Sequence, residues 1–284
     1  MLLLLGLWWW WRGRGGEEVV GTFNIRTFSG ARSDKEAVAA ALASLRADLV
    51  AVQEIQDQEL FAEVVARAGE LSGREYQVAL SPSCRGVEGL HLGVVYDAGR
   101  YSLVEQRRLS PVERGCPFGQ PAAALTRLLR EDGEGLGVVS VHLKALDSPR
   151  DHETRRAEWG WLLEQRRAIE AEIEAPVIVA GDFNSTGFLR PDHEERRFID
   201  ERVAAEGLRL PTAGIGCSMY WRSPDERRYV VSLLDHVLAP GAVEVGEAEA
   251  LGMCEALRCE AQDAAPPGFH TVSDHCPVRV VMRR

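Results

Sequence analysis

The chain has no apolar run long enough to cross a membrane. Its longest apolar stretch is MLLLLGLWWWW at residues 1–11, whereas a membrane-spanning helix needs about 20 residues. The length suits the core of a secretory signal, but no basic region precedes it and no A-x-A-like cleavage site follows it. We therefore expect residues 1–16 to be an apolar tail or a degenerate export signal. Residues 17–284 are expected to form a single domain with no stable membrane span.

An excess of basic residues is also missing. The 33 Lys and Arg residues are outnumbered by 43 Asp and Glu residues, which gives a formal net charge of −10. Proteins that hold nucleic acids electrostatically are normally basic, because each phosphate contact releases bound counterions. The composition therefore argues against tight, non-specific binding of polyanions. A phosphodiester still fits as substrate if a metal ion supplies positive charge locally.

Cysteine pairs with the C-x-x-C spacing of zinc sites are absent. The six cysteines are an even number, which fits disulfides in an oxidising compartment. Together with the apolar N-terminus, this favours a secreted or periplasmic protein over a cytoplasmic one. Cys84 and Cys116 lie in loop-like segments and are the preferred pair. Cys276 precedes a predicted strand and is expected to be a buried thiol.

No internal repeat or long linker divides the chain, and short β-rich runs alternate with helical patterns. Helices are predicted at 34–46, 57–71 and 151–174. Strands are predicted at 18–24, 48–53, 75–80, 91–97, 102–109, 123–130, 137–143, 175–184, 218–222, 233–239, 243–250 and 276–282. This is too many strands for one comfortable open sheet, so we expect two packed sheets in a layered α/β domain.

Polar residues cluster at the ends of these strands, which is where α/β folds display their sites. They include two Asp-His pairs, one Gly-Asp-x-Asn and a strand-terminal Gln-Glu. The candidates are Asn24, Glu54, His142, Asp182, Asn184, Asp235, His236, Asp274 and His275.

These residue types suit hydrolysis of a phosphodiester. Mg²⁺ prefers a few carboxylates and waters, and it can neutralise charge on phosphoryl oxygens. Glu54 with Asn24 or Asp274 would make such a site, for Mg²⁺ first and for Mn²⁺ or Ca²⁺ as alternatives. Histidine suits the transfer of protons to and from the reacting oxygens, because its pKa lies near neutrality.

Six motifs in order resemble the endonuclease/exonuclease/phosphatase superfamily, and specifically its deoxyribonuclease I-like branch. They are FNIRTF at 23–28, QE at 53–54, HLK at 142–144, GDFN at 181–184, LDHVL at 234–238 and SDHCPV at 273–278. The resemblance spans residues 18–283. It implies a four-layered αββα sandwich, in which two mixed β-sheets pack face to face between helices, with the site at one edge of the sheets.

The resemblance also implies a role for each residue. Glu54 would be the main metal ligand, with Asn24 beside metal and phosphate and Asp274 as a second or auxiliary ligand. His275 would be the general base, oriented by Asp235. His142 would be the general acid or a donor to a phosphoryl oxygen. Asp182 and Asn184 would hold the phosphate and the attacking or leaving oxygen.

Two departures from the deoxyribonuclease I pattern bear on the substrate. Gln56 stands where that branch has an arginine, and residues 118–121 lack a second DNA-contacting arginine. Because groove arginines supply much of duplex binding, efficient cleavage of double-stranded DNA is in doubt. The leading hypothesis is a monomeric, nuclease-like phosphodiesterase, with nucleic acid among its candidate substrates.

Two alternatives stay open. The first is a phosphatase or phospholipase C-type enzyme that acts on a phospholipid head group, an inositol phosphate or a small nucleotide, because loops choose the substrate. The loops expected to do so are 81–90, 110–121 and 186–200, and no exposed aromatic hairpin for membrane contact is evident. The second alternative is a non-catalytic binding protein on the same fold.

Some neighbouring residues have structural interpretations. His236 should point to the opposite face of its strand from Asp235 and be structural. His91 or Glu88 could supply a partner for His142. The pairs Arg155-Arg156 and Arg166-Arg167 alternate with glutamates and are expected on solvated helix faces.

Overall fold

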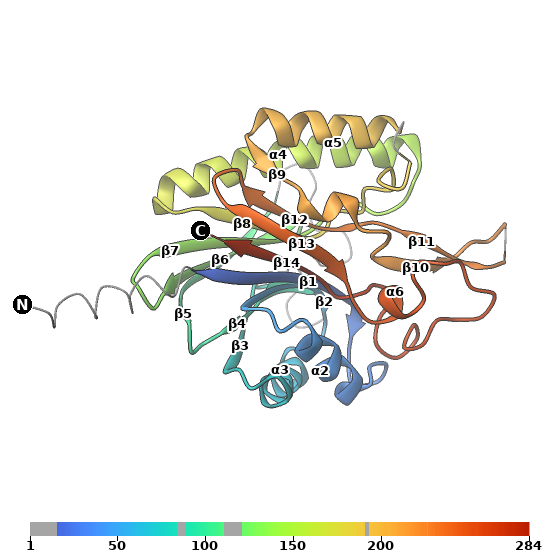
Figure 1. The fold of residues 1–284 in the computed structure, drawn as a ribbon, viewed down its shortest axis with the longest axis horizontal. Helices are drawn as coiled ribbons and strands as arrows, with labels where there is room; N and C mark the ends of the chain where they lie inside the picture. Colours follow the sequence, from blue (N-terminus) through green and yellow to red (C-terminus); the bar gives the residue numbers. More distant parts are fainter. Residues whose placement is uncertain (1–15, 84–88, 111–120, 191–192, 226, 284) are drawn as a thin grey trace, which may run out of the picture.

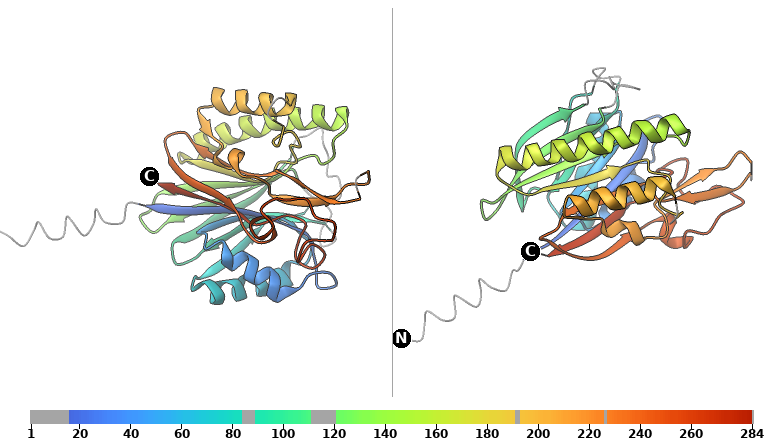
Figure 2. Two further views of the ribbon diagram at one scale, coloured as in Figure 1. Left: turned by 45° about the vertical axis from the view of Figure 1, so that its right-hand side comes forward. Right: turned by 90° about the horizontal axis from the view of Figure 1, so that it is seen from above.

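Two six-stranded sheets packed face to face form the centre of the computed structural model (Figure 1), which describes residues 16–83, 89–110, 121–190, 193–225 and 227–283. The first sheet has the order β13-β14-β1-β2-β4-β3 and the second the order β5-β6-β7-β8-β12-β9. Both are mixed, because β1 pairs with β2 and β7 with β8 in parallel while the other pairs are antiparallel. A separate hairpin, β10-β11, projects from one end of the sandwich (Figure 2).

The element bounds are as follows. The first sheet contains β1 (Glu17–Phe28), β2 (Leu49–Ile55), β3 (Tyr76–Leu80), β4 (His91–Asp97), β13 (Glu244–Ala250) and β14 (Val278–Arg283). The second contains β5 (Tyr101–Leu109), β6 (Ala123–Arg130), β7 (Gly135–His142), β8 (Val177–Asp182), β9 (Leu208–Arg209) and β12 (Asp235–Pro240). The hairpin is β10 (Met219–Arg222) and β11 (Tyr229–Ser232). The helices are α2 (Lys35–Ser44), α3 (Gln58–Ser72), α4 (Pro149–Ile173), α5 (Glu194–Ala205), α6 (Met253–Ala256) and the 3-10 helix η3 (Pro211–Gly214).

Helices cover the outer face of each sheet, so the sandwich has four layers. Helices α2 and α3 lie on the first sheet, and α4 and α5 lie on the second (Figure 1). Each interface has its own apolar cluster, and the cluster between the two sheets contains Val20, Leu49, Val138, Ile178 and Val280. The expected αββα architecture is thus confirmed. Burial of these apolar side chains is the main stabilising term for such a fold.

Local sequence signals explain why the elements begin where they do. Ser148 caps α4, accepting from the backbone N–H of Asp151 while the Asp151 carboxylate accepts from the Ser148 N–H. All six residues of β8 are buried, as expected for an apolar strand with a sheet neighbour on each side and a helix layer above. Gly181 has φ 153°, and a Cβ there would lie 2.1 Å from the carbonyl oxygen of Val141. A glycine is therefore required one residue before Asp182.

Several features of the structure differ from the sequence predictions. The segment 186–200 was expected to be a loop, but α5 begins at Glu194, with only Ile199 and Val203 as its apolar buried residues. Its apolar stripe is too narrow to stand out in the sequence. Strand β9, of two residues, and strand β11, of four residues, were also missed. Arg155 was expected to be solvated but is fully buried, because its Nε donates to Glu195 Oε1 at 2.6 Å.

Cys276 is not a free thiol. It forms a disulfide with Cys254, and Cys217 forms a second one with Cys259. The preferred pair of Cys84 and Cys116 lies outside the described residues.

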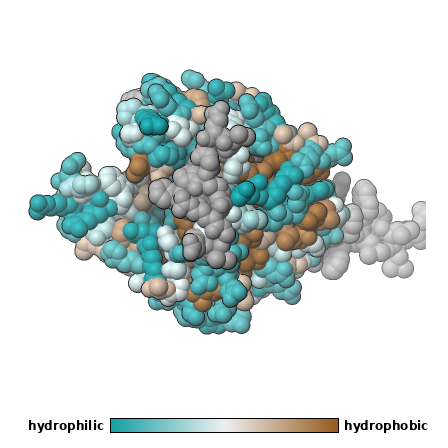
Figure 3. All heavy atoms as spheres, turned by 180° about the vertical axis from the view of Figure 1, so that it is seen from behind, coloured by the Kyte–Doolittle hydropathy of each residue, from teal (hydrophilic) through white to brown (hydrophobic). Residues whose placement is uncertain are grey.

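The surface of the molecule is mostly polar, with scattered apolar side chains (Figure 3). Seen from behind, polar side chains surround smaller apolar areas (Figure 3). Among the larger exposed apolar side chains are Leu103 and Val104 of β5 and Leu129 of β6. Within the described residues, no helix has both the length and the apolar character needed to cross a membrane.

Candidate active site

The predicted site residues meet at one end of the two sheets because of strand direction. β7 and β8 are parallel and β12 runs antiparallel to β8, so His142, Asp182 and Asp235 lie directly opposite one another on three adjacent strands. In the first sheet, β1 and β2 are parallel and bring Asn24 and Glu54 to the same end. The two rows face each other across the sandwich, joined by a hydrogen bond from Asn24 Nδ2 to Asp182 Oδ2 of 3.0 Å.

Asp182 is the centre of the cluster. Its Oδ2 lies 3.5 Å from His142 Nε2 and 3.7 Å from His275 Nε2, besides accepting from Asn24. Burial raises the pKa of this carboxyl, the two histidines partly offset that effect, and Asp235 adds to it. A buried carboxylate beside two imidazoles is a polar centre that a cation or a phosphoryl group can complete.

Glu54 is held by donors from β1. Its Oε1 accepts from Asn24 Nδ2 at 3.2 Å, and its Oε2 accepts from Thr27 N at 2.9 Å and Thr27 Oγ1 at 3.1 Å. Burial alone would raise the pKa of Glu54, but the charge of His142 and these hydrogen bonds outweigh it and lower the pKa. Glu54 is therefore held as a carboxylate, the form that binds a hard cation.

The backbone around Glu54 is strained. Glu54 has φ 62°, and Arg26 and Thr27 have φ 33° and 53°. Non-glycine residues in this region cost about 1–3 kcal/mol each, and they persist where neighbouring contacts hold them. The irregular pairing of β1 with β2 after Asn24 aims the Thr27 donors at Glu54.

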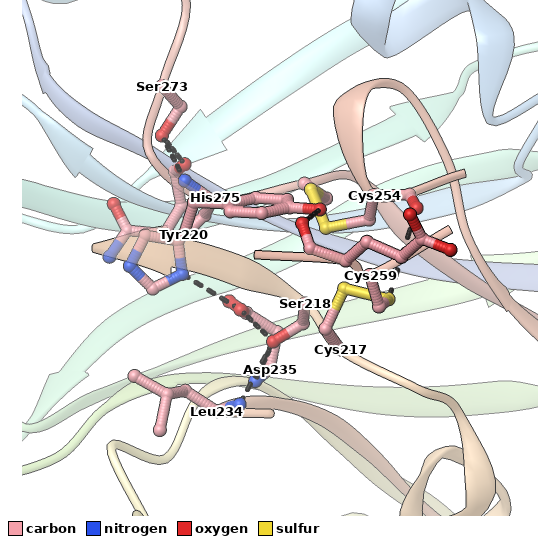
Figure 4. Close-up of a disulfide and its surroundings, with 12 residues drawn as sticks. Cys217, Ser218, Tyr220, Leu234, Asp235, Cys254, Cys259, Ser273 and His275 are labelled. Carbon is pink, nitrogen blue, oxygen red and sulfur yellow. Dashed lines mark hydrogen bonds and ion pairs between the residues drawn. A yellow bond between two sulfur atoms is a disulfide. The ribbon is translucent and has the colours of Figure 1, made fainter. Parts of the chain in front are cut away.

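His275 is fixed by a carboxylate and a serine. Its Nδ1 donates to Asp235 Oδ2 at 2.8 Å, and the same oxygen accepts from Ser218 Oγ at 2.7 Å (Figure 4). Burial alone would lower the pKa of His275, but the charges of Asp235 and Asp182 outweigh it and raise the pKa well above its usual value. With Nδ1 held in this way, Nε2 is the atom that faces Asp182.

Asn184 and Asp274 lie at the border of the cluster. Asn184 has φ 52°; its backbone N–H donates to Asp182 Oδ1 and its side chain to the carbonyl of Leu143. Asp274 Oδ2 forms an ion pair with Arg26 Nε at 3.2 Å. The predicted roles of these two residues stay predictions, and Asn184 orients Asp182 in the arrangement seen here.

The donor atoms fit a divalent cation. Ligand atoms of Asp182, Asp235 and His275 lie within 4.8 Å of one another. Among the described residues, buried Oδ1 atoms of Asp235 and Asp274 have no hydrogen-bond partner, as expected of oxygens that a cation would complete. The possible ligands Asp182, Asp235 and His275 thus differ from the predicted metal ligands Asn24, Glu54 and Asp274.

The amide of Asn24 bears on that predicted set. Its Nδ2 donates to Glu54 and Asp182, while its Oδ1 accepts from the Arg26 N–H at 2.9 Å. In this arrangement Asn24 orients the carboxylates of Glu54 and Asp182. Its Oδ1, the atom that could bind a metal, already accepts a hydrogen bond from the Arg26 N–H.

Two residues that hold the carboxylates of the cluster were not among the predicted site residues. Ser218 and Thr27 hold Asp235 and Glu54 but belong to no predicted ligand set. Thr27 lies within the FNIRTF motif and could have been found there, whereas nothing marks Ser218 in the sequence. His236 is buried away from the centre, with Nδ1 3.0 Å from Thr212 Oγ1. His91 Nδ1 lies 2.7 Å from the carbonyl of Ser81. Glu88 lies outside the described residues.

Fold and site together define an αββα sandwich with a carboxylate and imidazole centre at the edge of its sheets. The model of the endonuclease/exonuclease/phosphatase family matches residues 21–275. The chain belongs to this family. Membership supports the hydrolysis of phosphoester bonds as the class of activity. No curated protein matches the chain.

Solved structures confirm the fold but differ in what they are named for. A mannosyl-6-phosphatase of Bacteroides thetaiotaomicron matches with a TM-score of 0.64 and 18% identity, covering 94% of this chain and 100% of its own. TDP2 of Caenorhabditis elegans has a TM-score of 0.63 and 18% identity, with 95% and 99% covered. The human Nocturnin catalytic domain, with a bound sulfate anion, has a TM-score of 0.60 and 18% identity, with 94% of each chain covered. At these identities the likeness establishes the fold alone.

Proposed function

We propose that the protein is a divalent-metal-dependent phosphodiester hydrolase. One observation carries this proposal: the Nε2 atoms of His142, at the end of β7, and of His275, in the segment before β14, lie 3.5 and 3.7 Å from the same oxygen of Asp182. Two imidazoles next to one buried carboxyl group suit phosphoester hydrolysis. One imidazole can remove a proton from the attacking water, and the other can give a proton to the leaving oxygen on the opposite side of the phosphorus atom. A binding protein on this fold would need neither.

His275 is the proposed general base. Its Nδ1–H is held by Asp235, so Nε2 carries the lone pair that takes a proton from the attacking water. Asp235, which accepts from Nδ1, also stabilises the imidazolium that forms. His142 gives a proton to the leaving oxygen or donates a hydrogen bond to a phosphoryl oxygen.

The carboxylates have a separate task. Glu54, with Asp274 or Asp182, would hold Mg²⁺ or Mn²⁺, which supplies positive charge for the phosphoryl oxygens when bound. Asn24 keeps Glu54 and Asp182 side by side through its two hydrogen bonds. Without this bridge, two neighbouring carboxylates would repel each other and move apart.

The substrate is proposed to be a single-stranded or small phosphodiester. Duplex DNA is disfavoured by Gln56, where an arginine would contact the groove, and by the net charge of −10. A phosphatase acting on a small phosphomonoester is the second candidate, favoured by the same two features. We also propose that the protein works in an oxidising compartment, since it carries disulfides.

A panel assay with purified protein and Mg²⁺ tests the proposal. Substrates are bis-p-nitrophenyl phosphate, p-nitrophenyl phosphate, plasmid DNA and single-stranded DNA. We expect hydrolysis of bis-p-nitrophenyl phosphate and single-stranded DNA. In His275→Ala the rate of hydrolysis should fall by at least about 100-fold. The matched control is His270→Ala, which removes an exposed histidine from the same part of the chain. Absence of hydrolysis on every substrate would overturn the proposal.

A further inference from the structure

Two disulfides connect one short segment to two parts of the proposed site, the segment of the general base His275 and the segment of Ser218. Cys254 and Cys259 belong to the turn that begins with α6. Cys254 is bonded to Cys276, the residue after His275, and Cys259 is bonded to Cys217, the residue before Ser218 (Figure 4). Covalent bonds therefore fix the two backbone positions next to the side chains that hold Asp235.

The two tethered segments also pair with each other. The Cys276 N–H donates to the Ser218 carbonyl at 2.7 Å, and the Tyr220 N–H donates to the Asp274 carbonyl at 2.9 Å. Ser218 Oγ accepts from the N–H groups of Leu234 and Asp235 while it donates to Asp235 Oδ2. A displacement at Cys217 is thus transmitted to the carboxylate that orients His275.

The two disulfides differ in access. Cys217, Cys254 and Cys276 are buried, whereas Cys259 is half-buried. A surface pocket of about 370 Å³ lies over the Cys217–Cys259 bond, and Gly216 and Arg258 are among its lining residues. A small thiolate can enter such a pocket and reach the Cys259 sulfur. Cys254 also lines this pocket, but it is only 1% exposed and Cys276 is fully buried, so the Cys254–Cys276 bond is less accessible than the Cys217–Cys259 bond.

We propose that the Cys217–Cys259 disulfide is a redox-sensitive modification site that controls turnover by positioning Ser218 and Asp235. The proposal rests on the hydrolase function above. A dithiol of the dithiothreitol class is the reductant. Its thiolate attacks Cys259 Sγ and forms a mixed disulfide while Cys217 leaves as a thiolate. Its second thiolate then displaces Cys259. Two electrons and two protons pass to the protein, and the dithiol becomes a cyclic disulfide.

Reduction should lower kcat more than KM. Glu54 and Asn24, which are proposed to bind metal and phosphate, lie on β2 and β1 of the first sheet, whereas Asp274 is the one proposed metal ligand in the segment next to Cys276. A shift of about 1 Å in a positioning group can cost up to about 100-fold in rate. We expect kcat to fall by about 10- to 100-fold and KM to change by less than about threefold.

The experiment compares oxidised wild type, dithiothreitol-treated wild type and the double variant Cys217→Ser/Cys259→Ser. Alkylation of the free thiols followed by peptide mass spectrometry establishes which bonds are reduced, and bis-p-nitrophenyl phosphate hydrolysis gives kcat and KM. The treated wild type should lose turnover and regain it after reoxidation with glutathione disulfide. The double variant should have the reduced kcat from the outset and respond little to dithiothreitol. Unchanged kcat in the double variant would overturn the proposal.

Hydrogen exchange supplies a readout that does not depend on activity. Reduction should speed exchange of the amides of Ser218, Tyr220 and Cys276, while the central strands β1 and β8 stay protected. Global loss of protection would overturn the proposal, because the bond would then be merely structural. If oxidised wild type hydrolyses none of the substrates, the proposed function fails. The exchange pattern still decides whether the bond positions these segments, and no change at the three amides would refute it.

Discussion

Replacing Asp235 by Asn isolates the carboxylate that holds the general base. Asp235 is fully buried, and its Oδ2 accepts from both His275 Nδ1 and Ser218 Oγ. An asparagine has nearly the same shape but no negative charge. Its amide oxygen can accept one of these bonds, while its NH₂ group takes the place of Oδ1, which has no hydrogen-bond partner among the described residues.

The expected loss follows from what the negative charge does. A positioned general base contributes about 10²- to 10⁴-fold to a rate, which corresponds to about 3–5 kcal/mol at 1.36 kcal/mol per decade. Without the charge, the imidazolium formed in the reaction loses its buried counterion. We therefore expect kcat to fall by about 10²- to 10⁴-fold, with little change in KM. The unpaired amide donor should lower the free energy of unfolding by about 1–3 kcal/mol.

The pH profile gives a second signature. Burial lowers the pKa of His275, and Asp235 is the leading cause of its net increase. A base acts only when neutral, so the wild-type rate should rise with pH up to a point above 6.5. In Asp235→Asn the pKa of His275 should fall, and the residual rate should reach its plateau at a lower pH.

Initial rates of bis-p-nitrophenyl phosphate hydrolysis with Mg²⁺ between pH 5 and 9 measure both effects. The matched control is Asp263→Asn, which removes an exposed carboxylate paired with Arg228. The control should behave like wild type. A kcat within threefold of wild type in Asp235→Asn, at every pH, would refute the role given to the Asp235–His275 pair.

Three further outcomes are expected. Treatment with a chelator should abolish hydrolysis, and added Mg²⁺ or Mn²⁺ should restore it. Glu54→Gln should need a much higher metal concentration for hydrolysis than wild type. Full activity in chelator would contradict the metal role. His142→Ala should lower kcat by about 10²-fold or more, and an unchanged single-turnover rate would remove it from the mechanism. Burial lowers the pKa of His236 from 6.5 to about 3, so the neutral ring stabilises the fold above pH 6.5 and this contribution is lost as pH falls towards 3. At 1.36 kcal/mol per pH unit the loss of stability is about 3–5 kcal/mol. Denaturant unfolding at a series of pH values should show this fall in the free energy of unfolding in wild type but not in His236→Phe. The same dependence of the free energy of unfolding on pH in both proteins would refute this assignment.

Strand-end residues were predictable because sequence order and strand direction determine them. An apolar run followed at once by a polar residue, as at Asn24, Glu54 and Asp182, places that side chain at a sheet edge in any layered α/β fold. The buried row of His142, Asp182 and Asp235 then depends only on which strands are neighbours. The order of the strands in the sheet came from the family resemblance. The sequence pattern within each strand does not contain it.

Contacts that depend on tertiary geometry could not be predicted. Ser218 is an unremarkable serine until the fold places it against Asp235. The Cys254–Cys276 pairing depends on where α6 lies, which four residues cannot signal. Arg155 resembles a solvated helix residue until Glu195, 40 positions further on, meets it in the interior. In each case the deciding partner is distant in the sequence.

The most direct test of the shared centre is a crystal structure grown with Mn²⁺ and inorganic phosphate, with anomalous scattering to locate the metal. We expect an anomalous peak at about 2.0–2.2 Å from a carboxylate oxygen of Glu54, a range set by octahedral Mg²⁺-type coordination. The phosphate should lie between the Nε2 atoms of His142 and His275. Mn²⁺ bound elsewhere, or a phosphate that touches neither imidazole, would contradict the account.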